Sequence, residues 1–426
     1  MDTENVGPLA GIRVVEVGTH VAGPFAGQLL GDFGAEVIKI EQPTGGDPMR
    51  HWGPVRPEGY SLWWEVLGRN KKSVTVDLRQ PEGQALVRRL VLERADVLLE
   101  NFRPGTLERW GLDPAELQEV RPDLIVARVS GYGQTGPYAR RAGFGSIGEA
   151  MGGIRHVTGE PDRPPSRVGV SLGDALAGVF AAYGVAMSLV HRERTRAATS
   201  GMPSSNGHGP PRTGGQVVDV AIYEAVLALM ESLVLDYELT GHVRGRTGST
   251  LPNVAPSNIY RAADGVWVLI AANADAPFRR LVEVMEQPQL AEDPRFATHL
   301  ARGEHAQDLD ELIGAWARGL SAEKLVEVLS EHGVPASGIY TAKEMLTDPH
   351  FAARESLIQT VHPVLGEMHM QAPFPRLSAT PGSVRSTGPA HGQHNDEVLG
   401  DLLGLSNADI DALRRAGVVA GEPATK

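Results

Sequence analysis

The 426-residue sequence contains no cysteine, which excludes disulfide bonds, thiolate nucleophiles and cysteine-based metal sites. Positive charge is also scarce, because acidic residues outnumber basic ones and leave a net charge of −12. A general affinity for nucleic acid or for anionic membranes is therefore not expected. Uninterrupted apolar runs stay shorter than the roughly 18 residues that a membrane span needs. Since the acidic N-terminus lacks a signal-peptide core, the sequence predicts a cytoplasmic protein.

The residues that are present are typical of a globular enzyme, with 42% hydrophobic and 22% charged residues, and the length favours two or more folding units. The first half alternates short apolar runs with helix-like stretches such as Pro24–Asp32 and Glu82–Glu93. Strands are expected at Ile12–Val17, Glu36–Glu41, Ser73–Leu78, Asp96–Glu100, Leu124–Val129 and Gln216–Val220. This alternation predicts a parallel, doubly wound α/β sheet, which binds ligands at the carboxyl ends of its strands.

Two long helices are expected in the middle of the chain. Asp174–His191 is rich in small residues that allow another backbone to pack closely, and Ile222–Leu239 has a continuous helical pattern. Arg194–Gly215 lies between them and contains almost no large apolar residue, so we expect an exposed, mobile loop there. From about Thr240 the pattern changes, which indicates a smaller second domain.

The segment Arg163–Gly178 is the most informative stretch for chemistry, because a strand-like run ends in Gly173 and Asp174 at the start of a long helix. An aspartate in this position can cap free backbone N–H groups, which is one interpretation of Asp174. The other is functional: the positive end of the helix dipole favours an ionised carboxylate, and Gly173 leaves room for a substrate. An ionised carboxylate can attack a thioester carbonyl and form a mixed anhydride. These residues alone leave both interpretations open.

An ordered series of short motifs extends along nearly the whole chain. Its members include Leu9-Ala-Gly-Ile-Arg-Val-Val-Glu-Val17, Leu30-Gly-Asp-Phe-Gly-Ala-Glu-Val-Ile-Lys-Ile-Glu-Gln-Pro43, Asn70-Lys-Lys-Ser-Val-Thr-Val-Asp-Leu78, Glu100-Asn-Phe-Arg-Pro-Gly105, Gly131-Tyr-Gly133, Asp293-Pro-Arg-Phe296 and Gly333-Val-Pro-Ala336. With these motifs in this order, the chain resembles the class III CoA-transferases, the formyl-CoA transferase and carnitine CoA-transferase family, from about Pro8 to Gly400. Asp174 falls where the aspartate nucleophile of that family lies.

The resemblance implies a fold and an assembly. The family has a large, doubly wound Rossmann-like domain built from both chain ends and a smaller α+β domain from the middle. We place the large domain at residues 1–222 and 336–426, and the linker helix with the small domain at residues 223–335. The resemblance further implies a ring-shaped monomer, two of which interlock as a homodimer.

The resemblance also implies a reaction between an acyl-CoA and a carboxylic acid. Asp174 would attack the acyl-CoA and form an acyl-aspartyl anhydride, and the released CoA thiolate would return to form an aspartyl-CoA thioester. An incoming carboxylate would then take the CoA in the reverse sequence. CoA thioester is thus expected as a co-substrate, with no prosthetic group and no metal, although His391 and His394 are closely spaced. Water must stay out, because anhydrides hydrolyse.

The CoA contacts of the family carry over to eleven positions here. They are His20, Val21, Ala22, Gln42, Val76, Arg79, Asn101, Phe102, Arg103, Thr106 and Arg109. Arginine suits phosphate groups, and Phe102 can pack against adenine. Taken singly, each arginine also fits a solvated surface charge and Phe102 fits core packing. As a group around the Glu100–Gly105 motif, these residues favour ligand binding.

Three positions depart from the formyl-CoA transferases, so formyl and oxalate substrates are not expected. Val21 and Gly145 replace an assisting glutamine and glutamate, and Phe144 replaces a neighbouring tyrosine. Racemases on the same scaffold need a histidine where Phe144 stands, which counts against proton shuttling at Cα. A racemase or isomerase is nevertheless one alternative. A non-catalytic CoA-binding subunit of a hetero-oligomer is another, which an intact Asp174 disfavours.

We expect the acceptor to be a C4–C5 dicarboxylic acid, such as malate, citramalate, itaconate or mesaconate, with succinyl-CoA as the donor. The region before Asp174 carries Arg140, Arg141, Arg155, His156, Arg163 and Arg167, and a second carboxylate needs such a cationic partner. Gly145–Arg155 also resembles this segment in family members that act on succinate-type acids. An equally good interpretation is that these cationic side chains bind the phosphates of CoA or face solvent. The candidate substrate residues are Phe144, Gly145, Glu149, Arg140 and Arg141, and Glu149 also fits an exposed helix surface.

Overall fold

The computed structural model describes residues 7–199 and 213–420, which form two compact units. The larger unit contains the residues up to Ile154, Val168–Ser232 and the residues from Glu355 onward, and the smaller contains Arg155–Arg167 and Leu233–Arg354. The domain boundaries expected after residues 222 and 335 stay predictions.

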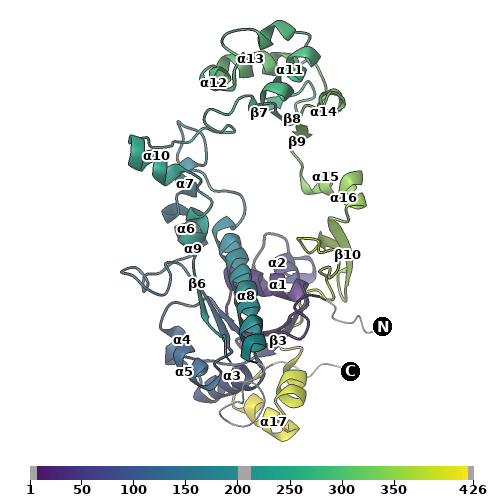
Figure 1. The fold of residues 1–426 in the computed structure, drawn as a ribbon. Helices are drawn as coiled ribbons and strands as arrows, with labels where there is room; N and C mark the ends of the chain where they lie inside the picture. The colour runs from purple at the N-terminus through teal and green to yellow at the C-terminus, as the bar shows by residue number, and fades with distance from the viewer. Residues whose placement is uncertain (1–6, 200–212, 421–426) are drawn as a thin grey trace. The chain divides into compact units, whose positions relative to one another are not determined.

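The larger unit is built on a six-stranded parallel sheet with the strand order β3-β2-β1-β4-β5-β6. Figure 1 labels its two edge strands, β3 and β6. The strands are β1 (Arg13–Glu16), β2 (Glu36–Glu41), β3 (Lys71–Thr75), β4 (Val97–Glu100), β5 (Ile125–Ser130) and β6 (Val217–Ala221). The predicted α/β class with a parallel sheet is therefore confirmed. The strand order reverses between β1 and β4, and sheets of this kind bind ligands outside the carboxyl ends of the strands at that point.

Alternate strand residues face opposite sides of the sheet and build two separate cores. Val14 and Val37 face one side, where they pack with helices α1 (Ala22–Asp32) and α8 (Leu172–Thr199). Val15 and Ile38 face the other side. The helices on that side include α3 (Pro81–Arg94), α4 (Thr106–Arg109), α5 (Pro114–Val120) and α17 (Asn407–Arg415). Helices on both faces are what a doubly wound sheet requires.

Helix α8 is the long, small-residue helix that the sequence predicted, and its close packing has a visible cause. A Cβ added to Gly178 would lie 2.9 Å from the carbonyl oxygen of Ala22 in α1, so only glycine allows this approach. By length and composition alone, Leu172–Ala198 could also cross a membrane, although it contains no uninterrupted apolar run of that length. Since one side of α8 packs against α1, β5 and β6, we assign it to the core of the larger unit.

Two expectations for the middle of the chain were wrong in part. The predicted loop begins later than Arg194, because α8 continues to Thr199, with Arg196 bound to Asp123 at 2.7 Å. Residues 200–212 of that loop lie outside the described residues. The predicted helix Ile222–Leu239 is divided into α9 (Ile222–Leu227) and α10 (Leu233–Thr240). The division coincides with Glu231, whose left-handed φ of 51° ends helical geometry, and with the passage into the smaller unit.

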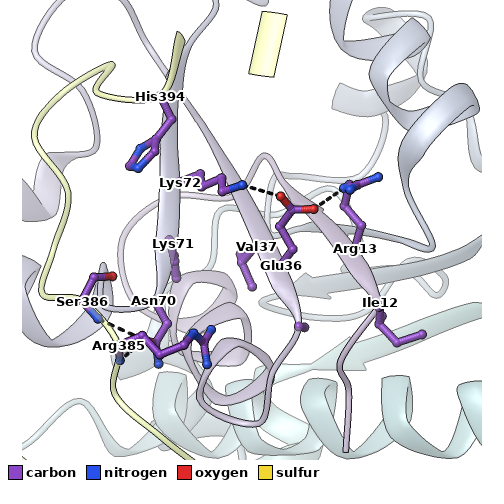
Figure 2. A pocket seen from close by; sticks show the side chains of 12 residues that line it. Ile12, Arg13, Glu36, Val37, Asn70, Lys71, Lys72, Arg385, Ser386 and His394 are labelled. Carbon is purple, nitrogen blue, oxygen red and sulfur yellow. Dashed lines mark hydrogen bonds and ion pairs between the residues drawn. The ribbon is translucent and has the colours of Figure 1, made fainter. Parts of the chain in front are cut away.

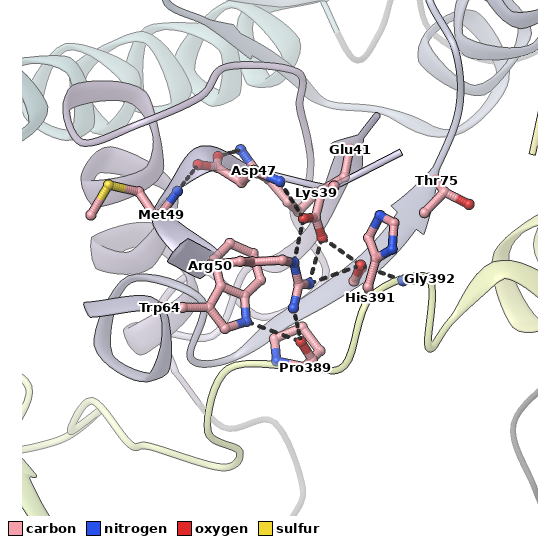
Figure 3. Close-up of polar contacts among 12 residues, drawn as sticks. Lys39, Glu41, Asp47, Met49, Arg50, Trp64, Thr75, Pro389, His391 and Gly392 are labelled. Atoms are coloured by element: carbon pink, nitrogen blue, oxygen red, sulfur yellow. Dashed lines mark hydrogen bonds and ion pairs between the residues drawn. The ribbon is translucent and has the colours of Figure 1, made fainter. Parts of the chain in front are cut away.

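The C-terminal segment of the larger unit is bound to the sheet by a buried polar network (Figure 3). Arg50 donates to Glu41 at 2.7 and 2.8 Å and to the carbonyl of Pro389 at 3.0 Å, and Trp64 Nε1 donates to the same carbonyl. Burial raises the pKa of Glu41, but the hydrogen bonds and charge of Arg50 outweigh it and lower this pKa to about 2. His391 Nε2 also donates to the main-chain carbonyl of Gln42 at 2.9 Å. These contacts join the C-terminal segment to residues near the beginning of the chain.

The smaller unit has its own core around an antiparallel sheet of β7 (Ser257–Arg261), β8 (Trp267–Ala271) and β9 (Ala336–Gly338). Its helices include α11 (Asp275–Val284), α12 (His299–Glu304), α13 (Ala306–Ala317) and α14 (Ala322–Glu331). The hairpin β10 (Leu357–His362) and β11 (Gly366–Gln371) belongs to the larger unit.

Candidate active site

Asn101 joins two loops at the carboxyl edge of the sheet. Its Oδ1 accepts from the N–H of Thr19 at 2.8 Å, and its Nδ2 donates to the carbonyl of Thr19 at 2.7 Å. A Cβ added to Gly18 would lie 2.5 Å from Asn101 Oδ1, so glycine keeps the loop after β1 close to this side chain. The structure thus places Asn101, a predicted CoA residue, as a clamp between the loops that follow β1 and β4.

A buried ion network also supports the loop that follows β1, and Lys39 and Asp47 of this network are labelled in Figure 3. Lys39 is fully buried and lies 3.1 Å from Glu16 and 2.8 Å from Asp47, while its Nζ also donates to the carbonyl of Gly18. Burial lowers the pKa of Lys39, but the two carboxylates outweigh this effect and raise it. Asp47 Oδ1 accepts from the N–H of His20, whose left-handed φ of 65° turns the chain there. The network holds His20 at the edge of the sheet.

A cavity of about 1180 Å³ lies beside the loop that follows β4. Four predicted CoA residues line it, namely Phe102, Arg103, Thr106 and Arg109. Phe102 packs edge-on against Trp110, with ring centroids 4.9 Å apart, and Arg109 donates to the hydroxyl of Thr106 at 3.0 Å. Arg128 and residues 134–137, which belong to or follow β5, complete the lining. Its arginines and its place at the carboxyl edge suit a ligand that carries phosphate groups.

Arg128 connects the two segments that form this cavity. Its Nε donates to Glu100 at 2.8 Å and its Nη1 to Glu108 at 2.9 Å, while Glu100 also accepts from the N–H of Phe102 at 2.6 Å. Burial raises the pKa of Glu100 to about 7, although Arg128 opposes this rise. The sequence analysis missed Arg128, Glu100 and Glu108. A signal was available, because Arg128 is a lone charge within a strand that is otherwise buried and apolar.

The other predicted CoA residues lie outside the lining of this cavity. The side chains of Val21, Ala22 and Val76 are buried in apolar clusters, so only their main chain is available to a ligand. The guanidinium of Arg79 is mostly exposed and pairs with the carboxylate two residues before it at 2.8 Å. Gln42 contacts the C-terminal segment through its main-chain carbonyl.

Asp174 lies in the first turn of α8 as the third residue of the helix, which is inside the helix and not at its N-cap. Its carboxylate packs against Gly145, the first residue of α6 (Gly145–Met151). A Cβ added to Gly145 would lie 2.6 Å from Asp174 Cγ and 3.0 Å from Oδ1, so any side chain there would displace the carboxylate. Glu149 on α6 is 1% exposed and accepts from the N–H of Gly173 at 3.3 Å. The alternative interpretation of Glu149 as an exposed helix glutamate is therefore excluded. Gly145 contacts Asp174, Glu149 contacts the neighbouring Gly173, and Phe144 directly precedes Gly145 in the chain.

Two aromatic side chains contact His20 at this edge, and a third packs against one of them. The ring of His20 lies 5.6 Å from Trp52 and 6.1 Å from Phe144, both nearly perpendicular, and Trp52 lies 6.0 Å from Trp63. These rings are partly exposed, and Phe144 reaches 63%. Exposed aromatic rings of this kind are available to cover a bound ligand and to exclude water. The sequence analysis did not identify Trp52 or Trp63.

The two remaining substrate candidates, Arg140 and Arg141, contact different parts of the structure. Arg140 lines the large cavity together with Arg109. Arg141 places its guanidinium 3.6 Å from the ring centroid of Tyr138, a cation–π contact. The cations of segment Arg155–Arg167 belong to the smaller unit.

A second cavity, of about 390 Å³, lies at the opposite, amino edge of the sheet (Figure 2). Glu36 accepts from Arg13 and Lys72 at 2.5 Å each, and Lys72 also pairs with Glu397. His394 accepts from the N–H of Ser73 through Nδ1. Because these charges already bind one another, we regard this edge as structural. His391 and His394 likewise hold the C-terminal segment, and the described residues contain no cluster of three or more metal-ligating side chains.

Comparisons with known proteins agree with this geometry. The model of CoA-transferase family III matches residues 9–395. The chain is 60% identical over 412 residues to the succinyl-CoA–D-citramalate CoA-transferase of Chloroflexus aurantiacus, covering 97% of this chain and 98% of that protein. It is 40% identical over 414 residues to the succinyl-CoA–L-malate CoA-transferase alpha subunit of Chloroflexus aurantiacus, covering 97% and 92%. The crystal structure of a CAIB/BAIF family protein from Brucella suis superposes with a TM-score of 0.78 at 34% identity, covering 93% of this chain and 99% of that one.

Proposed function

Because this chain belongs to CoA-transferase family III and is an enzyme that transfers CoA, we propose that it moves CoA from succinyl-CoA to a small dicarboxylic acid through covalent intermediates on Asp174. The observation that carries the proposal is the Asp174 carboxylate, held in the first turn of α8 where Gly145 leaves space for it. The choice of substrates is supported by the two relatives named for succinyl-CoA with citramalate and with malate.

The first half of the reaction transfers CoA onto the enzyme. An oxygen of Asp174 attacks the carbonyl carbon of succinyl-CoA, the carbon–sulfur bond breaks, and the thiolate of CoA leaves a succinyl-aspartyl anhydride behind. The thiolate then attacks the aspartyl carbonyl of this anhydride, releases succinate and forms an aspartyl-CoA thioester. The N-terminal turn of α8 favours the ionised form of Asp174 that begins the sequence.

The second half returns CoA to an acceptor. A carboxylate of the acceptor attacks the aspartyl-CoA thioester and expels the thiolate, which gives an acceptor-aspartyl anhydride. The thiolate attacks the acceptor carbonyl, and this step releases the new acyl-CoA and restores the carboxylate of Asp174. Each anhydride is destroyed by water, so we assign the rings of His20, Trp52 and Phe144 the task of covering the intermediates.

Replacing Asp174 by alanine tests the mechanism. We expect Asp174→Ala to abolish transfer while its melting temperature and its binding of CoA stay close to those of the wild type. Hydroxylamine added after incubation with succinyl-CoA should modify Asp174 specifically, as peptide mass spectrometry would show. An alanine variant with turnover near that of the wild type would exclude a covalent role for this residue.

A panel of acceptor acids tests the substrate class. With succinyl-CoA as donor, kcat/KM for citramalate, malate, itaconate and mesaconate is compared with that for butyrate, crotonobetaine and oxalate. Loss of one buried charge-assisted pair costs on the order of 2–4 kcal/mol, so the monocarboxylic acids butyrate and crotonobetaine should be at least ~30-fold poorer. Equal use of a monocarboxylic acid would refute the dicarboxylate assignment and leave CoA transfer intact.

We also propose that the protein is an interlocked homodimer of ring-shaped monomers. The support is a stripe of exposed apolar side chains along α8, formed by Val179, Tyr183, Met187 and Val190. Exposed apolar surface of this kind is typical of a contact between chains. Interlocked dimers should not exchange subunits without unfolding. Recovery of mixed dimers within minutes of combining tagged and untagged protein would contradict the model, and activity that required a second gene product would favour a hetero-oligomer.

A further inference from the structure

Two independent contacts place His20 beside the first turn of α8. Gly178 lies one turn after Asp174 on the same face of this helix, and a Cβ added to Gly178 would lie 2.9 Å from the carbonyl oxygen of Ala22, two residues after His20. From the other side, the ring of His20 lies 6.1 Å from that of Phe144, and the residue after Phe144 packs against the Asp174 carboxylate. His20 therefore neighbours the place where an acyl group on Asp174 would lie.

The backbone of His20 is held in a conformation that few residues adopt. Its φ of 65° is left-handed, and its N–H donates to Asp47 at 3.2 Å. Asp47 in turn pairs with Lys39 at 2.8 Å, and both of these side chains are fully buried (Figure 3). A residue other than glycine is strained in this region and persists only where its surroundings fix it, and such residues gather at functional sites. The fold thus sets the position of this imidazole.

One nitrogen of the imidazole is bound and the other is available. Nδ1 lies 3.0 Å from the hydroxyl of Thr19, whose N–H and carbonyl are bound to Asn101. When the hydroxyl donates to Nδ1, the proton of the neutral ring is on Nε2, and a protonated ring also donates from Nε2. Within residues 7–199 and 213–420, Nε2 has no hydrogen-bond partner. His20 therefore offers a free donor beside Asp174.

The proposed substrates share a group that needs such a donor. Succinyl-CoA and C4–C5 dicarboxylic acids react through one carboxyl group at Asp174, and the other carboxylate lies one short carbon chain away. An ionised carboxylate only accepts hydrogen bonds. Of the arginines predicted for this task, Arg140 lines the large cavity and Arg141 lies against the ring of Tyr138. Nε2 of His20 supplies the donor that the larger unit places next to the nucleophile.

We propose that His20 binds the distal carboxylate of the transferred acid through Nε2 and thereby selects dicarboxylic over monocarboxylic acids. The inference rests on the proposed transfer between succinyl-CoA and a dicarboxylic acid, and it adds the residue that makes the selection. Thr19 is a positioning residue, because its hydroxyl holds Nδ1 and so directs Nε2. The resemblance to class III CoA-transferases implied a CoA contact at His20, and the main chain of this residue stays available for that contact. Since donor and acceptor acids occupy the same place in turn, one side chain serves both halves of the reaction.

Butyryl-CoA is the probe, because it matches succinyl-CoA in length but has a methyl group in place of the distal carboxylate. When CoA is held covalently between the two half-reactions, kcat/KM for the donor reports the first half alone. The measured quantity is kcat/KM for succinyl-CoA divided by kcat/KM for butyryl-CoA, with citramalate as the acceptor. A hydrogen bond to a charged group corresponds to about a 10- to 100-fold change in affinity. We expect a wild-type ratio of at least ~30.

Two substitutions separate the donor from the ring. His20→Phe keeps an aromatic ring beside Trp52 and Phe144 but has no donor, so the ratio should fall to about 3 or less. His20→Gln loses the ring but keeps an amide donor at the position of Nε2 along the side chain, so the ratio should stay at about 10 or more. Thr19→Val should lower the ratio several-fold. His332→Phe, at an exposed histidine of the smaller unit, is the matched control and should keep the wild-type ratio.

Thermal unfolding checks the fold of each variant, because a phenylalanine is strained at this left-handed position. His20→Asn remains informative if His20→Phe does not fold. Asparagine tolerates a left-handed backbone, and its short amide reaches the position of Nδ1 but not that of Nε2. We therefore expect His20→Asn to lose the preference for succinyl-CoA as His20→Phe does.

The outcomes separate this inference from the proposed function. If the wild type prefers succinyl-CoA and the folded His20→Phe and His20→Asn variants keep that preference, the distal carboxylate is bound elsewhere; the inference is then wrong and the proposed transfer stands. A preference that follows the ring, retained in His20→Phe and lost in His20→Gln, also refutes it. Equal use of the two donors by the wild type would overturn both the inference and the dicarboxylate assignment.

A binding measurement covers the opposite case, in which Asp174 is not the nucleophile. Calorimetry on Asp174→Ala with CoA present compares the binding of succinate with that of butyrate. Tighter binding of succinate that disappears when His20→Asn is added would support the inference even if the covalent mechanism failed. Tighter binding of succinate that persists in the double variant would refute the role of His20.

Discussion

Substitution of Gly145 by alanine separates the position of the nucleophile from the stability of the fold. The added Cβ would lie 2.6 Å from Asp174 Cγ, whereas carbon atoms pack at about 3.5–4.0 Å. The carboxylate must therefore move by roughly 1 Å, and a misplacement of that size can reduce turnover about 100-fold. Alanine is at the same time a better helix former than glycine, by up to about 1 kcal/mol, and Gly145 begins α6 without a left-handed φ.

The expected result is a kcat about 100-fold below that of the wild type, with an unchanged or slightly raised melting temperature. The assay is transfer of CoA from succinyl-CoA to citramalate or malate, measured beside thermal unfolding. Gly245→Ala is the matched control, because an added Cβ there meets no atom within 4 Å and the backbone is not left-handed. A Gly145→Ala enzyme with kcat within about threefold of the wild type would refute the placement of Asp174 as the attacking group.

Two further predictions concern Asn101, which joins two loops at the site, and Glu65, a buried residue of α2 (Leu62–Leu67). Asn101→Ala removes both hydrogen bonds to Thr19, so we expect KM for succinyl-CoA to rise about tenfold with a smaller change in kcat; an unchanged KM would show that the clamp is dispensable. Burial raises the pKa of Glu65 to about 7, above the 4.5 of an unperturbed glutamate. The protonated form of Glu65 therefore stabilises the fold fully below pH 4.5, and this stabilisation is lost as the pH rises through 7. Glu65→Gln mimics the protonated form, so its melting temperature should be a few degrees above that of the wild type at pH 8 and close to it at pH 5. Equal melting temperatures at pH 8 would contradict burial as the cause of the pKa shift.

The sequence predicted the sheet well because its signal is local. Strands buried on both faces are rich in apolar residues, and β1, β2 and β5 each overlap the segment that predicted them. The break between α9 and α10 carried no such signal, because Ala228–Ser232 contains no proline or glycine. It is set by the left-handed Glu231 and by the passage between units, which is a tertiary effect.

The candidate site was predictable only where one motif contains several of its residues. Glu100–Gly105 supplied Phe102 and Arg103 together, and both line the large cavity. Gln134 and Arg128 reach the same cavity from β5 and its following loop, more than 20 residues away in sequence. Pairing of β4 with β5 brings them there, and no local pattern encodes that neighbourhood.

Buried charges at the carboxyl ends of the strands show how the fold prepares its site. Glu16, Glu41 and Glu100 each end a strand, and each binds a cation that also holds or contacts a loop at that edge. A buried ion pair is weak evidence for stability, because desolvation consumes much of its attraction, and apolar residues of similar size would serve a core as well. Removal of one partner is nevertheless costly, since it leaves a buried charge alone. These pairs therefore tie the loops to the sheet in one arrangement, and the positions of His20, Phe102 and the cavity depend on them.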